Sequence, residues 1–368
     1  MARSVVYLAT VRTDVKRNLF DKLDALLERL DLRRRFRKGC LAAVKLHFGE
    51  RGNTSYIAPT FVRRVVERIE ETGARPFLTD TNTLYVGSRC DAATHLRTAI
   101  ANGFDYAVAG APIVIADGLR GEYKRDVEVD GRRLRRVSIA GAVADADAMA
   151  VLTHFKGHEI SGFGGTLKNL GMGCASREGK LTQHSSCAPV VEPAGCTACG
   201  DCALHCPADA IDVGERAVID EGRCIGCGHC IAVCPEGTIK VRWNEEAAAV
   251  QEKMVEYAAG ALSGKEDRCV FLNFVTQVSP LCDCYGATDA PIVPDIGIAA
   301  SLDPVAIDQA SADLVNAAPG LADSALESGH EPGGDKFRGI HPDIDWTVQL
   351  RHAELMGLGS RDYELREI

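Results

Sequence analysis

Short runs of apolar residues alternate along the chain with longer segments in which apolar residues recur at every third or fourth position. The first pattern is typical of buried strands and the second of amphipathic helices, so their alternation indicates an α/β fold. The Asp130-Gly131 pair predicts a hairpin turn within residues 127–139. Strands are expected at residues 4–10, 40–48, 75–80, 112–117 and 148–155, and helices at residues 17–31, 57–72 and 92–102.

The same alternation returns after residue 243, with a helix expected at residues 244–261 and a strand at residues 269–278. Another helix is expected to begin at Pro304, because proline fits the first turn and the Asp303 carboxylate can cap free backbone amides. We prefer this structural role of Asp303 to a catalytic one. The pattern predicts an α/β fold with a mixed or parallel sheet and flanking helices, in a discontinuous domain formed by residues 1–187 and 244–368.

Composition and charge narrow the functional classes. The 368 residues are 46% hydrophobic and 25% charged, which is ordinary for globular proteins. The apolar run "VVYLATV" is too short to span a bilayer and lacks the flanks of a signal peptide, so we expect a cytoplasmic protein without a membrane partner. A net charge of -9 argues against nucleic-acid binding, although residues 32–39 and 131–138 are locally basic.

The chain has fifteen cysteines, and in a reducing cytoplasm so many thiols indicate metal or redox chemistry rather than disulfides. Residues 196–207 and 224–235 each read C-x2-C-x2-C-x3-C-P, the spacing with which thiolates hold cubane clusters. A structural zinc site would need only four ligands. In this motif the fourth cysteine binds the other cluster. The prediction is two [4Fe-4S] clusters, one held by Cys196, Cys199, Cys202 and Cys234, the other by Cys224, Cys227, Cys230 and Cys206.

The segment around these motifs is expected to form a compact ferredoxin-like module. Residues 210–224 have the pattern of a short hairpin between the two motifs, and residues 238–243 that of a returning strand. The module is therefore predicted to cover residues 188–243 and to be inserted between the two parts of the α/β domain. Two clusters in one small unit indicate that the protein carries electrons.

Polar side chains follow several of the predicted strands. Ligands of open α/β sheets bind beyond the carboxyl ends of the strands, so we expect these residues to converge on one site. The catalytic candidates are His47, His154, His158 and Lys168, because histidine has an unperturbed pKa near ~6.5 and suits proton transfer. "HFGE" at His47 and "HFKGHE" at His154 look like two copies of one sequence motif. The other polar residues at strand ends are Lys45, Glu50, Asn53, Asp80, Asn82, Lys156, Glu159, Asp283 and Asp289.

The glycine-rich stretch "SGFGGTLKNLGMG" surrounds a short predicted helix. Glycines let backbone amides approach a ligand, and a helix start attracts anions. Gly164, Gly165, Lys168 and Asn169 are therefore predicted to bind an anionic group of a small ligand; the alternative is that the glycines only form a tight turn. The spacing is neither that of a P-loop nor that of a dinucleotide fingerprint.

Cys282 and Cys284 lie in an aspartate-rich, turn-like segment outside the ferredoxin motif. Three interpretations remain open. The two thiols could hold a third metal or cluster together with Cys174, with Cys187 and His184 as further ligands. They could instead form a redox-active thiol pair, or they could be inert thiols. The C-x-C spacing cannot reproduce the C-x2-C loop of a ferredoxin.

Several motifs together resemble the iron-sulfur-centre proteins of the domain-of-unknown-function 362 family. They are "KLHFGE", "GGTLKNLGMGCASREGK", the double ferredoxin run, "CDC", "PIVPDIGIAASLDPVAIDQA" and "HAELMGLGSRDYEL", and they span nearly the whole chain. The resemblance implies a two-cluster ferredoxin module set within a larger α/β domain. Tyr285 departs from the family pattern, which has histidine or another polar residue at that position.

These features lead to a functional expectation. We expect an iron-sulfur redox protein, an oxidoreductase in which the ferredoxin module passes electrons to a ligand or metal site in the α/β domain. A redox partner protein and a small anionic ligand are expected. The first alternative is a non-enzymatic electron carrier or a metallocofactor-assembly factor that docks on a larger partner. The second is a module that only binds a phosphorylated molecule.

Overall fold

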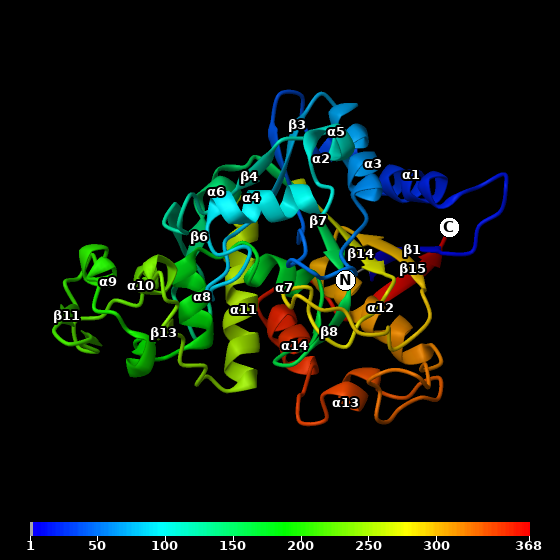
Figure 1. Cartoon of the computed structure of the whole chain (residues 1–368). Coiled ribbons are helices and arrows are strands. Elements are labelled where there is room, and N and C mark those ends of the chain that lie inside the picture. Colours follow the sequence, from blue (N-terminus) through cyan, green and yellow to red (C-terminus); the bar gives the residue numbers. More distant parts are fainter. Residues whose placement is uncertain (1–2) are drawn as a thin grey trace.

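The computed structural model describes residues 3–368 and contains a mixed eight-stranded sheet (Figure 1). Within this sheet only β15 runs antiparallel to its neighbours, β1 and β14. The other pairs are parallel. In spatial order the strands are β16 (Tyr363–Glu367), β1 (Ser4–Thr10), β15 (Gly297–Ser301), β14 (Cys269–Val275), β7 (Ala148–His154), β2 (Leu41–Lys45), β3 (Arg75–Asp80) and β4 (Ile113–Ile115).

Helices cover both faces of the sheet, as Figure 1 shows, and each face has its own hydrophobic core. The helices on one face are α1 (Leu19–Arg29), α2 (Leu32–Arg35), α3 (Pro59–Glu70), α4 (Ala92–Ala101) and α5 (Tyr106–Ala109). Those on the other face are α6 (Gly141–Asp145), α7 (Thr166–Gly171), α11 (Ala247–Leu262), α12 (Pro304–Ala317), α13 (Lys336–Ile340) and α14 (Thr347–Leu355). The protein thus has the layered α/β architecture in which buried strands are apolar along their whole length.

Two small hairpins and one further helix complete the body of the molecule. β5 (Lys124–Glu128) pairs with β6 (Arg136–Ala140), and β8 (Lys156–His158) pairs with β9 (Gly162–Gly164). Helix α8 (Arg177–His184) leads from α7 toward the cysteine-rich part of the chain. No helix within residues 3–368 combines the length and the apolar character that crossing a bilayer requires.

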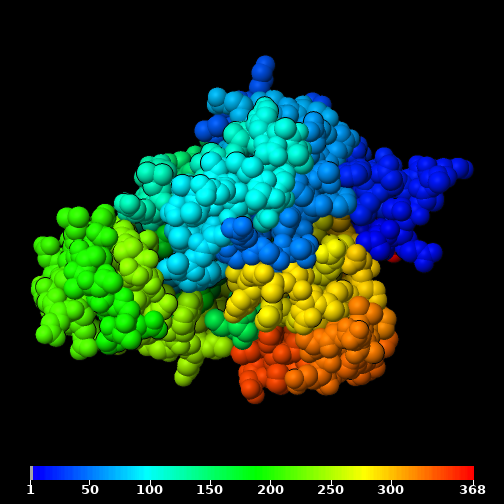
Figure 2. Space-filling model, viewed as in Figure 1, coloured from blue at the N-terminus to red at the C-terminus, as the bar shows by residue number. Residues whose placement is uncertain are grey.

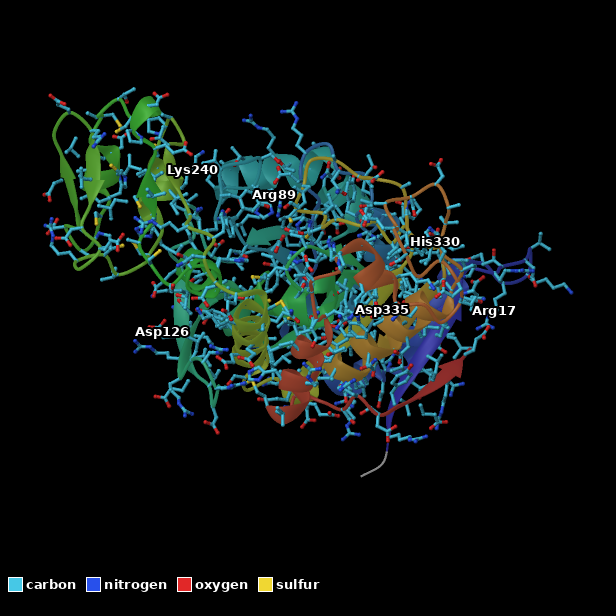
Figure 3. All side chains as sticks on the ribbon, turned by 90° about the horizontal axis from the view of Figure 1, so that it is seen from below. Arg17, Arg89, Asp126, Lys240, His330 and Asp335 are labelled. Atoms are coloured by element: carbon cyan, nitrogen blue, oxygen red, sulfur yellow. The ribbon has the colours of Figure 1, made fainter. Side chains whose placement is uncertain are left out.

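The cysteine-rich lobe, residues 188–243, projects from one side of the body, where Figures 1 and 2 show it in green. Figure 3 shows the same arrangement from below, with Lys240 on the lobe and Asp335 on the body. The strands of the lobe form two-stranded sheets of their own, and its buried side chains form a small cluster together with Leu84 and Leu181 of the body. Its elements are β10 (Val190–Val191), a 3-10 turn (Pro193–Gly195), α9 (Asp201–Leu204), β11 (Ile211–Val213), β12 (Ala217–Ile219), α10 (His229–Val233) and β13 (Ile239–Lys240).

The predicted fold class is confirmed, and several elements lie where the pattern places them. The bounds of β1 and β3 are the predicted ones. Helix α12 begins at Pro304, and Asp303 Oδ1 accepts hydrogen bonds from the amides of Val305 and Ala306 at 2.8 and 2.9 Å. The structural role expected for Asp303 is therefore confirmed. The pattern did not predict β15 or β16, and β2 ends three residues before the predicted strand does.

Candidate functional site

A cavity of about 730 Å³ lies beyond the carboxyl ends of β2, β3 and β7. The loop after β14 and the helices α7 and α8 form the rest of its wall. Because these parallel strands end at one edge of the sheet, their following residues come together although they are far apart in sequence. The polar residues that line the cavity are Lys45, His47, Glu50, Asp80, Tyr85, Arg89, Lys156, His158, Glu159, Lys168, Asn169, Lys180, His184, Cys284 and Tyr285.

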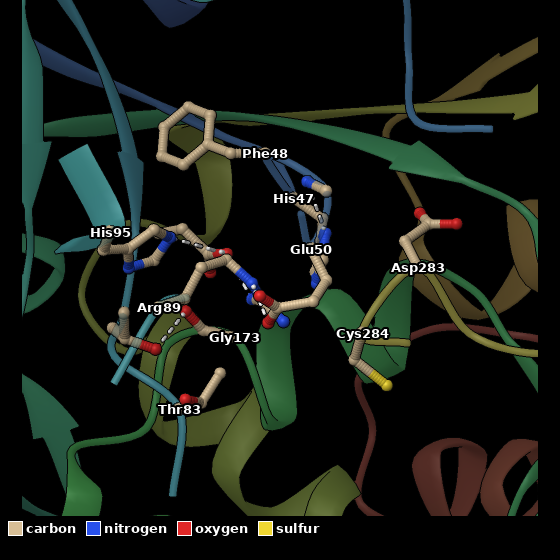
Figure 4. A network of polar contacts seen from close by, with 12 residues as sticks. His47, Phe48, Glu50, Thr83, Arg89, His95, Gly173, Asp283 and Cys284 are labelled. Atoms are coloured by element: carbon tan, nitrogen blue, oxygen red, sulfur yellow. Dashed lines mark hydrogen bonds and ion pairs between the residues drawn. The ribbon is translucent and has the colours of Figure 1, made fainter. Parts of the chain in front are cut away.

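Two buried ion pairs form one side of this cavity. Lys45 Nζ lies 3.0 Å from Asp80 Oδ1 and donates to Asn169 Oδ1 at 2.6 Å. Arg89 Nε donates to Glu50 Oε2 at 3.1 Å, a contact shown in Figure 4. Burial raises the pKa of Asp80, but Lys45, His47, His95 and Arg89 together outweigh it and lower that pKa overall. The Asp80 carboxylate is thus held in its charged form although water hardly reaches it.

His154 lies behind the cavity wall and forms an ion pair with Asp283. Its Nδ1 is 2.8 Å from Asp283 Oδ1, and its Nε2 lies 3.0 Å from the Thr276 carbonyl oxygen and 3.1 Å from that of Gln277. Both ring nitrogens lie against oxygen atoms, so hydrogen bonds hold the ring on two sides. Burial would raise the pKa of Asp283, but His154 and Lys156 lower it well below its ordinary range. The predicted catalytic candidate His154 therefore holds a loop in place.

His47 and His158 both line the cavity, and backbone amides fix which ring nitrogen carries the proton. His47 Nδ1 accepts from the Gly49 amide at 2.9 Å, and His158 Nδ1 accepts from the amides of Ile160 and Ser161, both at 3.2 Å. In each neutral ring the proton is then on Nε2. Burial, aided by nearby cations, lowers the pKa of both rings well below the ordinary value. These two histidines are neutral hydrogen-bond donors at the cavity wall.

Lys168 projects from α7 toward the two cysteines of the C-x-C motif. Its Nζ donates to Cys282 Sγ at 3.2 Å. Cys282 is buried, with 1% of its surface exposed, while Cys284 is half-buried and lines the cavity. Burial alone would lower the pKa of Lys168, but the neighbouring sulfur of Cys282 raises it overall. Lys168 is thus a permanent cation beside the pair.

The glycine-rich stretch is placed differently from the prediction. Gly164 and Gly165 do not line the cavity. The first amides of α7, those of Thr166 and Leu167, donate to the Asp308 carboxylate at 2.7 and 2.8 Å. A Cβ at Gly165 would lie 2.4 Å from Asp308 Oδ1. The glycines therefore allow a carboxylate of the chain itself to occupy the helix start, whereas Lys168 and Asn169 of the same stretch do reach the cavity.

Cys174 lies in the hydrophobic core rather than beside Cys282 and Cys284. It is fully buried, and burial raises the pKa of its thiol to about 11. Cys187 contacts Ser185 and Arg242, and of the further ligands expected only His184 lines the cavity. Among residues 3–368, no three His, Cys, Asp or Glu side chains are grouped to hold a single metal ion.

Two smaller cavities lie within the cysteine-rich lobe, and four cysteines line each of them. Each has a volume of about 20 Å³, against about 730 Å³ for the large cavity. The first is lined by Cys196, Cys199, Cys202 and Cys234, and the second by Cys206, Cys224, Cys227 and Cys230. Each set combines three cysteines of one motif with the fourth of the other, which is the grouping that cubane clusters need. The binding of iron at these cysteines stays a prediction.

The lobe packs against the cavity wall. A Cβ at Gly228, between Cys227 and Cys230, would lie 3.5 Å from Leu84 Cδ1, and one at Gly237 would lie 3.6 Å from Val86 Cγ2. Leu84 and Val86 both line the large cavity. Leu84 thus lines the large cavity and lies beside Gly228, which lines the second cysteine-lined cavity.

Sequence reasoning missed part of this wall. Tyr85 and Arg89 come from the long loop after β3, Lys180 from α8, and Trp243 from the end of the lobe. The site residues were predicted from their position directly after a predicted strand, and none of these four residues has that position. The loop after β3 is rich in polar and aromatic residues, and its length alone would have been a usable signal, since long loops in compact domains are often functional.

The chain matches one protein family and is similar in part to two solved structures. Residues 42–313 match the family model described as "Domain of unknown function (DUF362)". No curated protein matches the chain. One similar solved structure is the lactate racemase apoprotein from Thermoanaerobacterium thermosaccharolyticum, with 14% identity, a TM-score of 0.39, and coverage of 74% of this chain and 51% of that one. Another is a structural-genomics protein from Thermotoga maritima, with 12% identity, a TM-score of 0.34, and coverage of 69% and 50%. The chain spans about half the length of these structures.

Proposed function

The chain belongs to the family of the domain of unknown function 362, and we propose that it is an iron-sulfur redox protein whose cysteine-rich lobe supplies electrons to the large cavity. The observation that carries the proposal is the contact between the two. Leu84 and Val86 line the cavity and also pack against the loops that follow Cys227 and Cys234. Leu84 and Val86 thus connect the wall of the cavity to the lobe.

The cysteine-lined cavities suit [4Fe-4S] clusters. Backbone amides donate to three of the sulfurs: Ala210 to Cys206 at 3.3 Å, Ala217 to Cys196 at 3.4 Å, and Thr238 to Cys234 at 3.4 Å. Such hydrogen bonds stabilise thiolates, and they outweigh burial to lower the pKa of Cys234. When bound, the clusters supply one-electron transfer.

The large cavity suits a small anionic ligand. Five basic side chains line it, namely Lys45, Arg89, Lys156, Lys168 and Lys180, against three acidic ones, Glu50, Asp80 and Glu159. Lys180 Nζ donates to the Thr81 hydroxyl and, at 3.0 Å, to the Ala175 carbonyl oxygen, and burial lowers its pKa to about 8. A ligand with a carboxylate or phosphate group would balance the excess of positive charge. His47 and His158 would then donate hydrogen bonds to it from Nε2.

An external redox partner would dock on the lobe. Leu204, between Cys202 and Cys206, is 81% exposed, and Ile225, beside Cys224, is 62% exposed. Exposed apolar residues next to cluster loops are suited to transient contacts between electron-transfer proteins. This feature would also serve the alternative function, that of a carrier or assembly factor without its own substrate.

The proposal is tested on protein purified without oxygen. We expect about eight irons and eight sulfides per chain, as two four-iron clusters require, and the electron paramagnetic resonance spectrum of two reduced clusters after dithionite. Cys206→Ser should remove the signal of one cluster, whereas Cys40→Ser, which changes a cysteine outside the lobe, should leave both. A colourless protein, or iron that Cys206→Ser does not affect, would contradict the proposal.

Native mass spectrometry distinguishes the redox enzyme from the carrier. A small anionic molecule that co-purifies with the wild-type protein and is lost in Lys180→Met supports a ligand site in the cavity. A fully loaded protein that binds no such molecule supports the carrier function.

A further inference from the structure

We propose that Cys282 and Cys284 form a reversible dithiol-disulfide couple in the wall of the large cavity, with the Lys168 ammonium group beside Cys282. The two residues lie two positions apart in a turn, and Lys168 Nζ donates to Cys282 Sγ at 3.2 Å. The inference rests on the proposed function only for the physiological source of electrons.

The first support is the way the turn is held. Asp283 stands between the two cysteines, and its carboxylate is anchored on the far side by His154 and by Lys156, whose Nζ lies 3.6 Å from Asp283 Oδ2. Figure 4 shows the Asp283 carboxylate and the Cys284 sulfur pointing in different directions. Anchoring the middle residue turns both thiols toward Lys168 and the cavity. Inert thiols would not need this arrangement.

The second support is the uneven placement of the two sulfurs. The hydrogen bond from Cys284, together with Lys168 and Lys156, lowers the pKa of Cys282 well below its ordinary value against the effect of burial. The same hydrogen bond and burial raise the pKa of Cys284 well above its ordinary value. The two shifts run in opposite directions, so Cys282 is the first of the two thiols to lose its proton. A thiolate beside a thiol is the reactive form of a dithiol, because the thiolate is the nucleophile.

The third support is the cation beside the pair. Lys168 Nζ donates to Cys282 Sγ, and a cation stabilises a thiolate that is not bound to metal.

The chemistry of the couple can be written with a small disulfide as the oxidant. Cys284 lines the cavity, so its sulfur meets the oxidant. Cys284 Sγ attacks one sulfur of the oxidant, and the other half leaves as a thiol that carries the Cys284 proton. The Cys282 thiolate then attacks Cys284 Sγ, which releases the second half of the oxidant as a thiolate that takes up a proton from solvent. The net change is dithiol plus disulfide to disulfide plus two thiols, a two-electron transfer.

The test equilibrates the anaerobically purified protein, with its clusters, in buffers of reduced and oxidised glutathione. After acid quenching and alkylation, mass spectrometry of the peptide that contains residues 282–284 measures the disulfide. We expect a disulfide that forms in oxidising buffer and disappears in reducing buffer. A pair that stays reduced across the whole series, or that becomes irreversibly oxidised, would overturn the inference.

A second measurement tests the part of Lys168. In the native reduced protein, we expect Lys168→Met to slow alkylation of the pair by N-ethylmaleimide about tenfold, since the thiolate is the reacting species. Lys168→Arg, which keeps the charge, should restore most of the rate, and Cys90 serves as an internal reference in the same samples. Circular dichroism checks that Lys168→Met is folded. Equal alkylation rates in the wild type and in both folded Lys168 variants would overturn the role of Lys168.

Iron counting on the same samples separates this inference from the proposed function. Iron above about eight per chain that is lost in Cys282→Ser would assign the pair to a third metal centre and overturn the couple. A reversible disulfide in a protein without iron would contradict the proposed function alone. Full clusters with an unreactive pair would contradict this inference alone.

Discussion

At the scale of single residues, Asp283 connects the stability of the fold to the geometry of the site. Its carboxylate is fully buried and paired with His154, with Lys156 nearby. A buried ion pair adds little to the stability of the fold compared with an apolar pair of the same shape. Removing one partner, however, leaves an unpaired charge in the interior. The loop that carries Cys282 and Cys284 therefore depends on this contact.

We predict that Asp283→Asn lowers the free energy of unfolding by about 3–5 kcal/mol, the range for breaking a buried ion pair. Urea unfolding followed by circular dichroism measures the change. Asp289→Asn, in the same loop but exposed, is the matched control and should change stability by less than about 0.5 kcal/mol. Equal effects of the two substitutions would show that the buried pair does not hold the loop.

The same carboxylate predicts how stability depends on acid. The pKa of Asp283 is lowered in the folded protein, so its contribution is fully present above the unfolded value of about 3.9 and is lost as the pH falls below it toward the folded pKa. We expect the wild-type protein to lose more stability than Asp283→Asn between about pH 4 and pH 2. Unfolding midpoints measured across that range check this, and parallel pH profiles would refute it.

At the scale of elements, α7 determines where Lys168 and Asn169 lie. Its last residue, Gly171, packs against α11 so closely that a Cβ there would be 2.1 Å from the Met254 carbonyl oxygen. The helix is only six residues long and cannot bend to absorb an added atom. The close contact between the two helices thus fixes the lysine beside the cavity.

We predict that Gly171→Ala destabilises the protein by about 1–3 kcal/mol, the usual cost of overpacking a filled contact. The displaced α7 should also move Lys168 away from Cys282 and slow alkylation of the pair. Gly214→Ala is the control, because a Cβ there meets nothing within 4 Å. Unfolding and alkylation are measured on both variants, and an unchanged Gly171→Ala protein would show that α7 can shift without cost.

The elements also show what the hydrophobic pattern could and could not predict. β1 and β3 were predicted with their observed bounds because their apolar runs are rich in β-branched and aromatic residues or end at clear turn signals. β15 was missed because "GIAAS" contains glycine and two alanines and does not alternate. β16 was missed because "YELRE" is an exposed edge strand whose charged residues hide its pairing with β1.

The site was partly predictable because the order of the strands brings some of its residues together. Residues that directly follow parallel strands converge by topology alone, so Lys45, His47, Asp80 and His158 could be grouped from sequence. His154 has the same position relative to its strand, but its side chain points to the ion pair behind the wall, which no sequence pattern reveals. Trp243 reaches the cavity only because of how the lobe packs on the body.

At the scale of the whole molecule, the body and the lobe differ in what stabilises them. The body has two extended hydrophobic cores, one on each face of the sheet. The lobe has one small cluster whose buried residues include the cysteines Cys202 and Cys230. Such a small core supplies little stability by itself, and small metal-binding domains usually obtain the rest from their metal.

We therefore predict that removing iron unfolds the lobe and leaves the body intact. The physical reason is linkage, since a cluster that binds only the folded lobe contributes its binding free energy to folding. Hydrogen-deuterium exchange after treatment with a chelator and an oxidant should show fast exchange in residues 188–243 and unchanged protection in β14 and β7. The exchange of Leu84 and Val86 should rise as well, because these residues lose the lobe that packs on them. If the lobe stayed protected without iron, its fold would be independent of the clusters; if β14 and β7 lost protection too, body and lobe would unfold as one unit.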